Sequence, residues 1–291
     1  MKKLIFLLAI LALCLCGCGD KDKEAARIEV IDGVQYVAST TGGNHYIAYK
    51  ATDKTRTEYK IQDAVNGIAV TEIGAEAFKG CTNLKSITIG MNITSVGQSA
   101  FANCGALESA DILGNPVNGL TLGSRAFECC YNLSRVNIGA GVFEINYDSF
   151  DSCDKLRVFS VDDANPYYKD NDANLYTKDG TTLVRYAIGK MDRVFEVPKG
   201  VTTIAPSAFA DADNLFEVVV ENDVTTIGSY AFLSCYNLVK VTLGSGVSSV
   251  GGYAFSLCDM LTVYCEAMEK PSGWHEGWRD NSCDVVWGML Q

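Results

Sequence analysis

One hydrophobic pattern recurs seven times along the chain. It consists of the segments V-T-x-I-G, A-F-x-x-C and L-x-x-V-x-I, and its first copy covers residues 70–89. The phenylalanines in the middle of successive copies are 23, 26, 23, 59, 23 and 23 residues apart, at Phe78, Phe101, Phe127, Phe150, Phe209, Phe232 and Phe255. A spacing of 23 residues that occurs four times indicates an internal repeat.

Each copy predicts one coil of a stacked array. In L-x-x-V-x-I, apolar and polar residues alternate, which is typical of a strand with one buried face. V-T-x-I-G predicts a second extended piece on the opposite side. Ala77, Phe78, Cys81 and Leu84 have the spacing of one face of a short helix or 3₁₀ turn. One coil cannot cover its own apolar face, so the pattern predicts a repeat solenoid, mainly β with short helical or 3₁₀ turns.

The segments outside the seven copies predict the ends of the array and one interruption. Residues 27–66 contain strand-like segments separated by turns and predict an N-terminal β cap. Residues 67–265 form the predicted solenoid. Within it, residues 162–200 keep an apolar rhythm of their own and predict variant coils, because a structureless loop of that length is uncommon. Residues 266–291 hold all three tryptophans and predict a C-terminal cap.

The first residues predict an export signal. Two lysines precede residues 4–16, thirteen apolar residues that are too few for a membrane span of about 20 residues but suit a signal-peptide core. The next residues, Leu-Cys-Gly-Cys at 15–18, resemble a bacterial lipobox, in which a small residue precedes the lipid-bearing cysteine. The resemblance implies a signal peptide over residues 1–17, a lipid on Cys18 and a tether over residues 18–26. An ordinary secretory signal with incidental cysteines is the alternative.

Composition and charge narrow the class of function. Apolar residues make up 48% of the 291 residues, and 24 Lys and Arg against 35 Asp and Glu give a formal net charge of −11. This charge disfavours nonspecific binding to nucleic acid, whose phosphates attract basic proteins. The two histidines, His45 and His275, lie far apart in the sequence, and no G-x-S-x-G or H-E-x-x-H motif occurs. We therefore expect no enzyme activity, no metal and no cofactor.

Nine cysteines follow Cys18, and six of them occupy one position of the repeat. This recurrence favours a column of buried free thiols, because free cysteine behaves as a compact apolar residue and Ala212 fills the same position in the fifth copy. Disulfides or a metal site remain alternatives, since neighbouring coils bring cysteines close together. Outside the column, Cys265 with Cys283 is the pair singled out for a bridge. The column consists of Cys81, Cys104, Cys130, Cys153, Cys235 and Cys258.

An acidic stretch extends from the fourth copy into the variant coils. Carboxylate oxygens suit calcium, but the spacing of these residues matches no EF-hand loop. We therefore favour a solvated acidic surface over a calcium site. The stretch comprises Asp151, Asp154, Asp162, Asp163, Asp170, Asp172 and Asp179.

The repeat I-G-x-x-A-F-x-x-C-x-x-L-x-x-V-x-I resembles the BspA-like leucine-rich repeats of bacterial surface proteins, and its period of 23 lies within the leucine-rich-repeat range of about 20–29 residues. The insert at 165–200 and the ending with Trp274, Trp278 and Trp287 resemble variants of that family. The resemblance covers roughly residues 65–291. It implies a surface-exposed solenoid, in some members an adhesin, and carries over no catalytic residues. Asn146 departs from the pattern by replacing the repeat glycine in the fourth copy.

Two surfaces are candidates for binding. The first is the outward side of the predicted strands, which a solenoid exposes as a continuous curved sheet. The second is the cluster of Trp274, His275 and Trp278, whose rings suit a sugar or a protein partner, with packing on the last coil as the alternative. The outward strand positions are polar and mixed in sign: Lys85, Ser86, Thr88, Glu108, Asp111, Arg135, Asn137, Arg157, Ser160, Glu217, Lys240 and Thr242.

Together these features predict a non-catalytic exported lipoprotein, anchored to the bacterial cell envelope through Cys18 and exposed at the cell surface. The expected partner is a host, bacterial or matrix macromolecule bound by the strand face. Glycan binding through Trp274 and Trp278 is the alternative function. Contact with the membrane is expected only through the lipid, and nucleic acid is not an expected partner.

Overall fold

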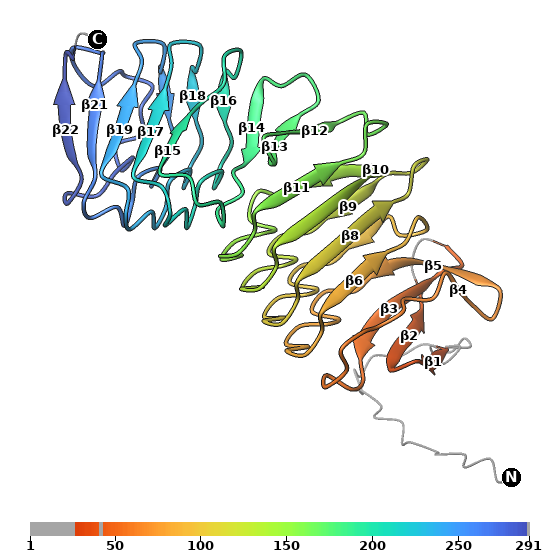
Figure 1. Ribbon diagram of the computed structural model, residues 1–291. Coiled ribbons are helices and arrows are strands. Elements are labelled where there is room, and N and C mark those ends of the chain that lie inside the picture. The colour runs from red at the N-terminus through yellow and green to blue at the C-terminus, as the bar shows by residue number, and fades with distance from the viewer. Residues whose placement is uncertain (1–26, 41–42, 290–291) are drawn as a thin grey trace, which may run out of the picture.

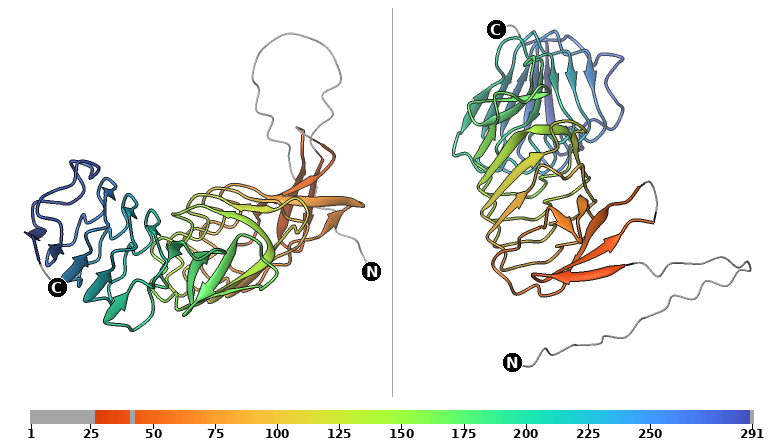
Figure 2. Two further views of the ribbon diagram at one scale, coloured as in Figure 1. Left: turned by 90° about the horizontal axis from the view of Figure 1, so that it is seen from above. Right: turned by 90° about the vertical axis from the view of Figure 1, so that its right-hand side faces the viewer.

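The computed structural model describes residues 27–40 and 43–289. In these residues twenty-two strands form an elongated stack of coils (Figures 1 and 2). The coils contribute parallel strands to two ladders, which we call the V-x-I sheet and the V-T-x-I sheet after the segments that form them. The predicted repeat solenoid is therefore confirmed.

The V-x-I sheet is built from the segment that the alternating pattern predicts to be a strand. In β6 the inward residues Ile87 and Ile89 are buried, whereas Ser86 and Thr88 are exposed. Its strands are β6 (Ser86–Ile89), β8 (Ser109–Gly114), β10 (Arg135–Ile145) and β11 (Val158–Val161), and then β15 (Val194–Glu196), β17 (Glu217–Val220), β19 (Lys240–Leu243), β21 (Thr262–Cys265) and β22 (Asp284–Trp287).

The V-T-x-I sheet runs along the opposite side of the coils. It shares β10 with the V-x-I sheet, because the first part of this strand pairs with β8 and β11 and its last part pairs with β9. Its other strands are β5 (Ile68–Ile73), β7 (Ser95–Val96) and β9 (Leu120–Leu122), and then β14 (Thr182–Arg185), β16 (Thr203–Ile204), β18 (Thr226–Ile227) and β20 (Ser249–Val250).

The first strands join the solenoid directly. The antiparallel strands β1 (Ile28–Ile31), β2 (Val34–Ala38) and β3 (Tyr46–Ala51) continue into the V-T-x-I sheet, because β3 pairs in parallel with β5. The short strand β4 (Ala64–Val65) forms a hairpin with β5. The domain boundaries drawn from the sequence stay predictions.

In the A-F-x-x-C segment, β-turns take the place of the predicted helical or 3₁₀ turns. In the first copy the Ala77 N–H donates to the Gly74 carbonyl at 3.2 Å, and a second turn follows at once. The third residue of each turn, Glu76 with φ of 56° and Gly80 with φ of 72°, is left-handed. A right-handed helix does not accommodate such residues, so the backbone turns twice and remains flat against the next coil.

The repeat phenylalanines form the centre of the core. All seven are buried, and their rings stack in two runs, from Phe78 to Phe150 and from Phe209 to Phe255, with centroids 5.0 Å apart for Phe78 and Phe101 and 4.9 Å apart for Phe232 and Phe255. Stacked pairs of this kind contribute about 0.5–1.5 kcal/mol beyond the burial of their area. The stacked rings therefore join neighbouring coils within each of these two runs.

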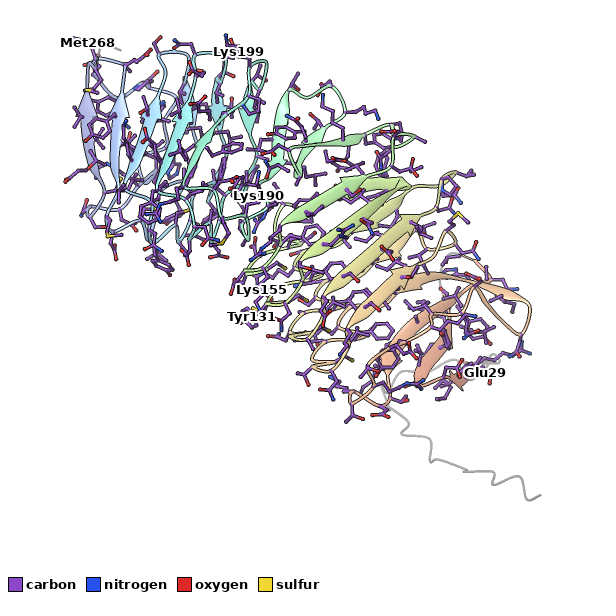
Figure 3. The ribbon with its side chains drawn as sticks, viewed as in Figure 1. Glu29, Tyr131, Lys155, Lys190, Lys199 and Met268 are labelled. Atoms are coloured by element: carbon purple, nitrogen blue, oxygen red, sulfur yellow. The ribbon has the colours of Figure 1, made fainter. Side chains whose placement is uncertain are left out.

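The array divides into two stacks. Buried apolar side chains form two clusters, one in the N-terminal stack (β1–β11) and one in the C-terminal stack (β14–β22). The stacks meet at residues 168–191, which we call the junction and which begin with the hairpin of β12 (Tyr168–Asn171) and β13 (Asn174–Thr177). The strands of the two stacks run in different directions in Figure 1, and Figure 3 places Lys190 where the stacks meet.

Candidate binding surfaces

The outward side of the V-x-I sheet in the N-terminal stack collects the polar residues that the sequence predicts. Because the strands are parallel and in register, equivalent residues of successive coils form rows across the sheet. Lys85, Glu108 and Arg157 directly precede β6, β8 and β11 and are exposed beside these rows. The two rows contain Ser86, Ser109 and Arg135, and Thr88, Asp111, Asn137 and Ser160.

Three charged side chains on this face have no partner within the described part of the chain. Lys85, Glu108 and Arg135 are exposed, and their side chains make no hydrogen bond or ion pair with a described residue. Arg157 differs, because its Nε donates to the Gly189 carbonyl at 3.1 Å and ties it to the junction. The free charges make this part of the face the one best suited to an external partner.

The corresponding face of the C-terminal stack is different. Glu217 and Lys240 form an ion pair with 2.7 Å between Oε1 and Nζ, so they neutralise each other. Thr242 is only 9% exposed and lies in register between Val219 and Tyr264. The expected continuous sheet is interrupted, because β11 and β15 belong to separate sheets.

The C-terminal tryptophans are packed against the last coils. Trp274 is 3% and Trp278 is 4% exposed, and the Trp274 Nε1–H donates to the Val247 carbonyl at 3.1 Å. The Trp278 ring meets the Phe255 ring edge to face at 5.6 Å, which ends the column of phenylalanines. His275 remains exposed beside them. The three residues therefore present no open aromatic platform for a sugar in this structure.

The nine cysteines from Cys81 to Cys283 are free, and all except Cys129 are buried. Column thiols donate to the phenylalanine carbonyl of the preceding coil; the Cys130 Sγ, for example, lies 3.2 Å from the Phe101 oxygen. Cys265 and Cys283 form no bridge, and burial raises the pKa of each thiol to about 12.

The predicted acidic stretch does not converge on one point. Asp151 pairs with Arg185 and Asp172 with Lys190, while the Asp179 carboxylate accepts hydrogen bonds from its own turn. In the described ranges, no group of three or more His, Cys, Asp or Glu side chains is placed to hold a metal ion.

Sequence reasoning missed a buried ion pair at the junction. Arg185, the last residue of β14, is 2% exposed, and its Nη1 lies 3.0 Å from Asp151 Oδ1, while its Nη2 donates to the Phe150 carbonyl at 3.2 Å. Burial raises the pKa of Asp151 to about 6; Arg185 opposes this rise and Asp211 adds to it. The signal that could have revealed this pair is an arginine at an inward position of the alternating segment Thr-Leu-Val-Arg at 182–185.

The repeat region matches a known protein family. A family model described as "BspA type Leucine rich repeat region" matches residues 57–171 and 192–267 in six copies. The chain belongs to the BspA-type leucine-rich repeat family. Residues 172–191 of the junction lie between the two matched segments.

Two solved structures share the fold. A leucine-rich repeat protein from Eubacterium ventriosum has a TM-score of 0.59 at 20% identity, and the match covers 85% of this chain and 74% of that protein. The pneumococcal vaccine antigen PcpA has a TM-score of 0.57 at 17% identity, with 92% and 87% covered. No curated protein matches the chain.

The predicted lipid site lies outside these observations. Cys18 and the signal segment precede the described residues, so the structure does not bear on them. In the part of the chain that is described, no helix is long and apolar enough to cross a membrane.

Proposed function

We propose that this protein is a non-catalytic surface lipoprotein whose N-terminal stack binds a host, bacterial or matrix macromolecule. The observation that carries the proposal is the set of unpaired charges of Lys85, Glu108 and Arg135 on the exposed V-x-I sheet. An exposed sheet with free charges of both signs suits a macromolecular surface better than a small ligand, which needs an enclosing pocket.

The proposed location rests on the lipobox-like residues before Cys18. A lipid on this cysteine, followed by a polar tether, would hold the solenoid at the membrane surface without a membrane-spanning segment. A protein with this fold is a pneumococcal vaccine antigen, which agrees with exposure of such a solenoid outside the cell.

The location is tested by protease shaving of intact cells, with mass spectrometry of the N-terminal peptide. We expect the solenoid to be released while an acylated peptide that begins at Cys18 stays with the membrane fraction. Complete protection of the solenoid in intact cells, with digestion after lysis, would contradict surface exposure. An unmodified N-terminal peptide would contradict the lipid.

The binding face is tested by charge reversal. The double variant Lys85→Glu/Arg135→Glu is compared with Lys50→Glu/Arg27→Glu, which makes the same change of charge at exposed positions beside β1 and on β3, off this face. Binding of the purified proteins to immobilised matrix proteins and to intact bacteria is measured. We expect the first variant to lose at least tenfold in affinity and the second to bind normally. Equal binding by both would remove this face as the site.

A further inference from the structure

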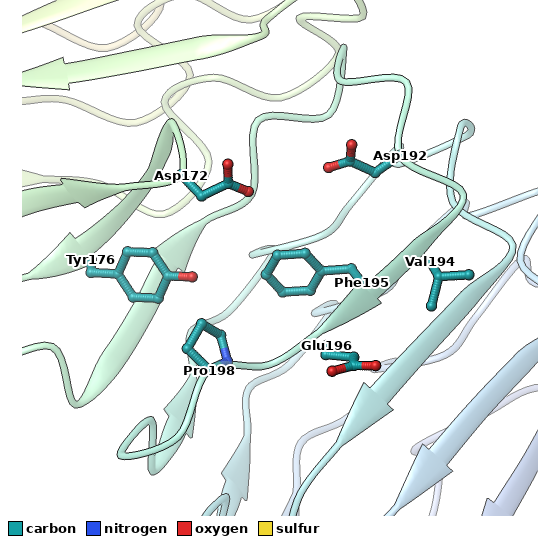
Figure 4. Close-up of a pocket in the computed structure, with 7 residues that line it drawn as sticks. All are labelled: Asp172, Tyr176, Asp192, Val194, Phe195, Glu196 and Pro198. Carbon is teal, nitrogen blue, oxygen red and sulfur yellow. The ribbon is translucent and has the colours of Figure 1, made fainter.

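The V-x-I sheet has a gap at the junction. On one side of the gap β11 pairs with β10, and on the other side β15 pairs with β17. The hairpin between them, β12–β13, belongs to the V-T-x-I side, since β13 pairs with β14. One edge of β15 is therefore left without a partner strand in the described part of the chain (Figure 4).

The backbone of β15 offers hydrogen-bonding groups along this edge. The Glu217 N–H donates to the Arg193 carbonyl and the Val197 N–H donates to the Val219 carbonyl, so residues 193, 195 and 197 face β17. Backbone groups alternate between the two edges of a strand, which leaves the N–H and C=O groups of Val194 and Glu196 directed into the gap. Such an edge is a template for an added strand.

A groove runs along the same edge. A cavity of about 460 Å³ is lined by Val194, Glu196 and Pro198 on the β15 side and by Asp172 and Tyr176 on the hairpin side (Figure 4). A second cavity of about 350 Å³ shares Tyr176 and Pro198 with the first and extends it. The two cavities together form one groove beside the free edge of β15.

A buried hydroxyl without a partner points into this groove. Tyr176 is 2% exposed, and its OH makes no hydrogen bond with a described residue. Figure 4 shows the hydroxyl directed into the cavity between Asp172 and Phe195. The Asn174 Nδ2 is also buried and unpartnered. Asn174 lies beside the Tyr176 hydroxyl and lines neither cavity, so the hydroxyl is the buried polar group that a ligand in the groove would reach.

The first cavity, beside β15, carries an excess of negative charge, which favours a cation there. Asp172, Asp192 and Glu196 line the first cavity, and the Lys190 ammonium lies 2.5 Å from the Asp172 carboxylate and 3.0 Å from the Asp192 carboxylate. The second cavity is lined by Lys169, Asp170 and Lys199, so the negative charge is concentrated in the first cavity. The Glu196 carboxylate makes no ion pair with a described residue and remains free for an external cation. The described carboxylates are not placed to hold a metal ion.

We propose that this groove binds an extended basic peptide segment of another protein, which adds a strand to the free edge of β15. Its backbone pairs with Val194 and Glu196, one of its lysine or arginine side chains meets the Glu196 carboxylate, and a polar group reaches the Tyr176 hydroxyl. A second copy that pairs its own β15 edge here is disfavoured as the occupant, because the Glu196 carboxylates of the two edges repel each other. The site is separate from the face of Lys85 and Arg135.

The test uses the full chain in detergent and the end-blocked fluorescent hexapeptide KVKVKV, with binding measured by fluorescence anisotropy. Comparison peptides are EVEVEV, which reverses the charge, and KVKVKV methylated at alternate backbone nitrogens, which keeps the charge but removes backbone donors. We expect saturable one-to-one binding of KVKVKV, at least tenfold weaker binding of the methylated peptide, and none of EVEVEV. Equal binding of the methylated peptide, or no saturable binding of KVKVKV, would overturn the proposal.

Single substitutions test whether the peptide binds in this groove. Glu196→Lys is expected to weaken binding at least tenfold, whereas the matched control Glu144→Lys, on β10, leaves it unchanged. Val194→Pro removes one N–H from the free edge, where proline is tolerated, and is expected to weaken binding similarly. Tyr176→Phe is expected to weaken binding several-fold without lowering the thermal midpoint, since the lost hydroxyl has no partner in the free protein. Equal losses in Glu196→Lys and Glu144→Lys would show nonspecific attraction and overturn the proposal.

Discussion

Cysteine in this repeat acts as a hydrogen-bond donor as well as a core residue. Five column thiols lie 3.0–3.2 Å from the phenylalanine carbonyl of the preceding coil. The carbonyl of Phe150 has no cysteine above it, and the guanidinium of Arg185 takes this role. The column therefore forms a series of hydrogen bonds between neighbouring coils. Arg185 is the one arginine in this series, and it lies where the two stacks meet.

The burial of the cysteines should determine how they react with a thiol reagent. In the native protein we expect a thiol reagent to modify Cys129, which is half-buried, and to leave the eight buried cysteines from Cys81 to Cys283 unmodified. After unfolding in urea without reductant, all nine should react. Peptide mapping by mass spectrometry measures both states. A pair of cysteines that stays unmodified in urea until a reductant is added would reveal a disulfide and contradict the free-thiol column.

Replacing Arg185 should lower the free energy of unfolding strongly. Arg185→Met leaves the Asp151 carboxylate without its partner in a buried setting, and removing one member of such a pair costs about 3–5 kcal/mol. The matched control is Arg125→Met, because the Arg125 side chain is 55% exposed and its ion pairs are long. An exposed pair contributes about 0–1 kcal/mol. Urea unfolding measures both, and equal losses would contradict the buried role of Arg185.

At the scale of one element, the repeat glycine sets how closely two coils approach. A Cβ added to Gly97 would lie 2.4 Å from the Ala75 nitrogen of the preceding coil, whereas a Cβ on Gly74, in the first coil, would meet nothing closer than 3.6 Å. Neither glycine has a positive φ, so the requirement is space and not backbone freedom.

This difference predicts opposite outcomes for one chemical change. Gly97→Ala should lower the free energy of unfolding by about 1–3 kcal/mol, because backbone atoms of the neighbouring coil must move. Gly74→Ala should change it by less than about 0.5 kcal/mol. Urea unfolding monitored by circular dichroism compares the two. If Gly74→Ala is as destabilising as Gly97→Ala, the close approach of the coils is not the reason for the glycine.

The strands were predictable and the turns were not, for a physical reason. The alternation of apolar and polar residues in β6 determines that Ile87 and Ile89 lie on the buried side of the strand. The parallel register of neighbouring strands then determines which residues form rows on the outward side. The spacing of Ala77, Phe78 and Cys81 is shared by a helix and by two successive β-turns. The difference lies in left-handed residues such as Glu76, which the sequence does not mark.

The junction was the least predictable part of the candidate sites. Tyr176 and Arg185 lie in the insert, between the two segments that match the family model, so no repeat position fixes their orientation. Their importance follows from contacts between residues distant in sequence, such as Arg185 with Asp151. The burial of Trp274 and Trp278 likewise depends on how the last coil ends.

At the scale of the whole molecule, the two stacks are joined through a buried charge. The guanidinium of Arg185, on the first strand of the C-terminal stack, binds the Asp151 carboxylate of the N-terminal stack. Asp211 lies near the same carboxylate and accepts a hydrogen bond from the Ser152 N–H. The coupling between the stacks therefore depends on the protonation of Asp151.

This coupling predicts an unusual dependence of stability on pH. Burial raises the pKa of Asp151 from 3.8 to about 6, with Asp211 and Asp148 adding to the rise and Arg185 opposing it. Between these values the folded state binds more protons than the unfolded state, so the contribution of Asp151 to stability falls as pH rises from about 4 to about 6. Urea unfolding at several pH values should show the stability difference between wild type and Asp151→Asn falling across this window. Asp163→Asn, at an exposed carboxyl, serves as the control substitution. A difference for Asp151→Asn that stays constant or rises with pH would contradict the prediction.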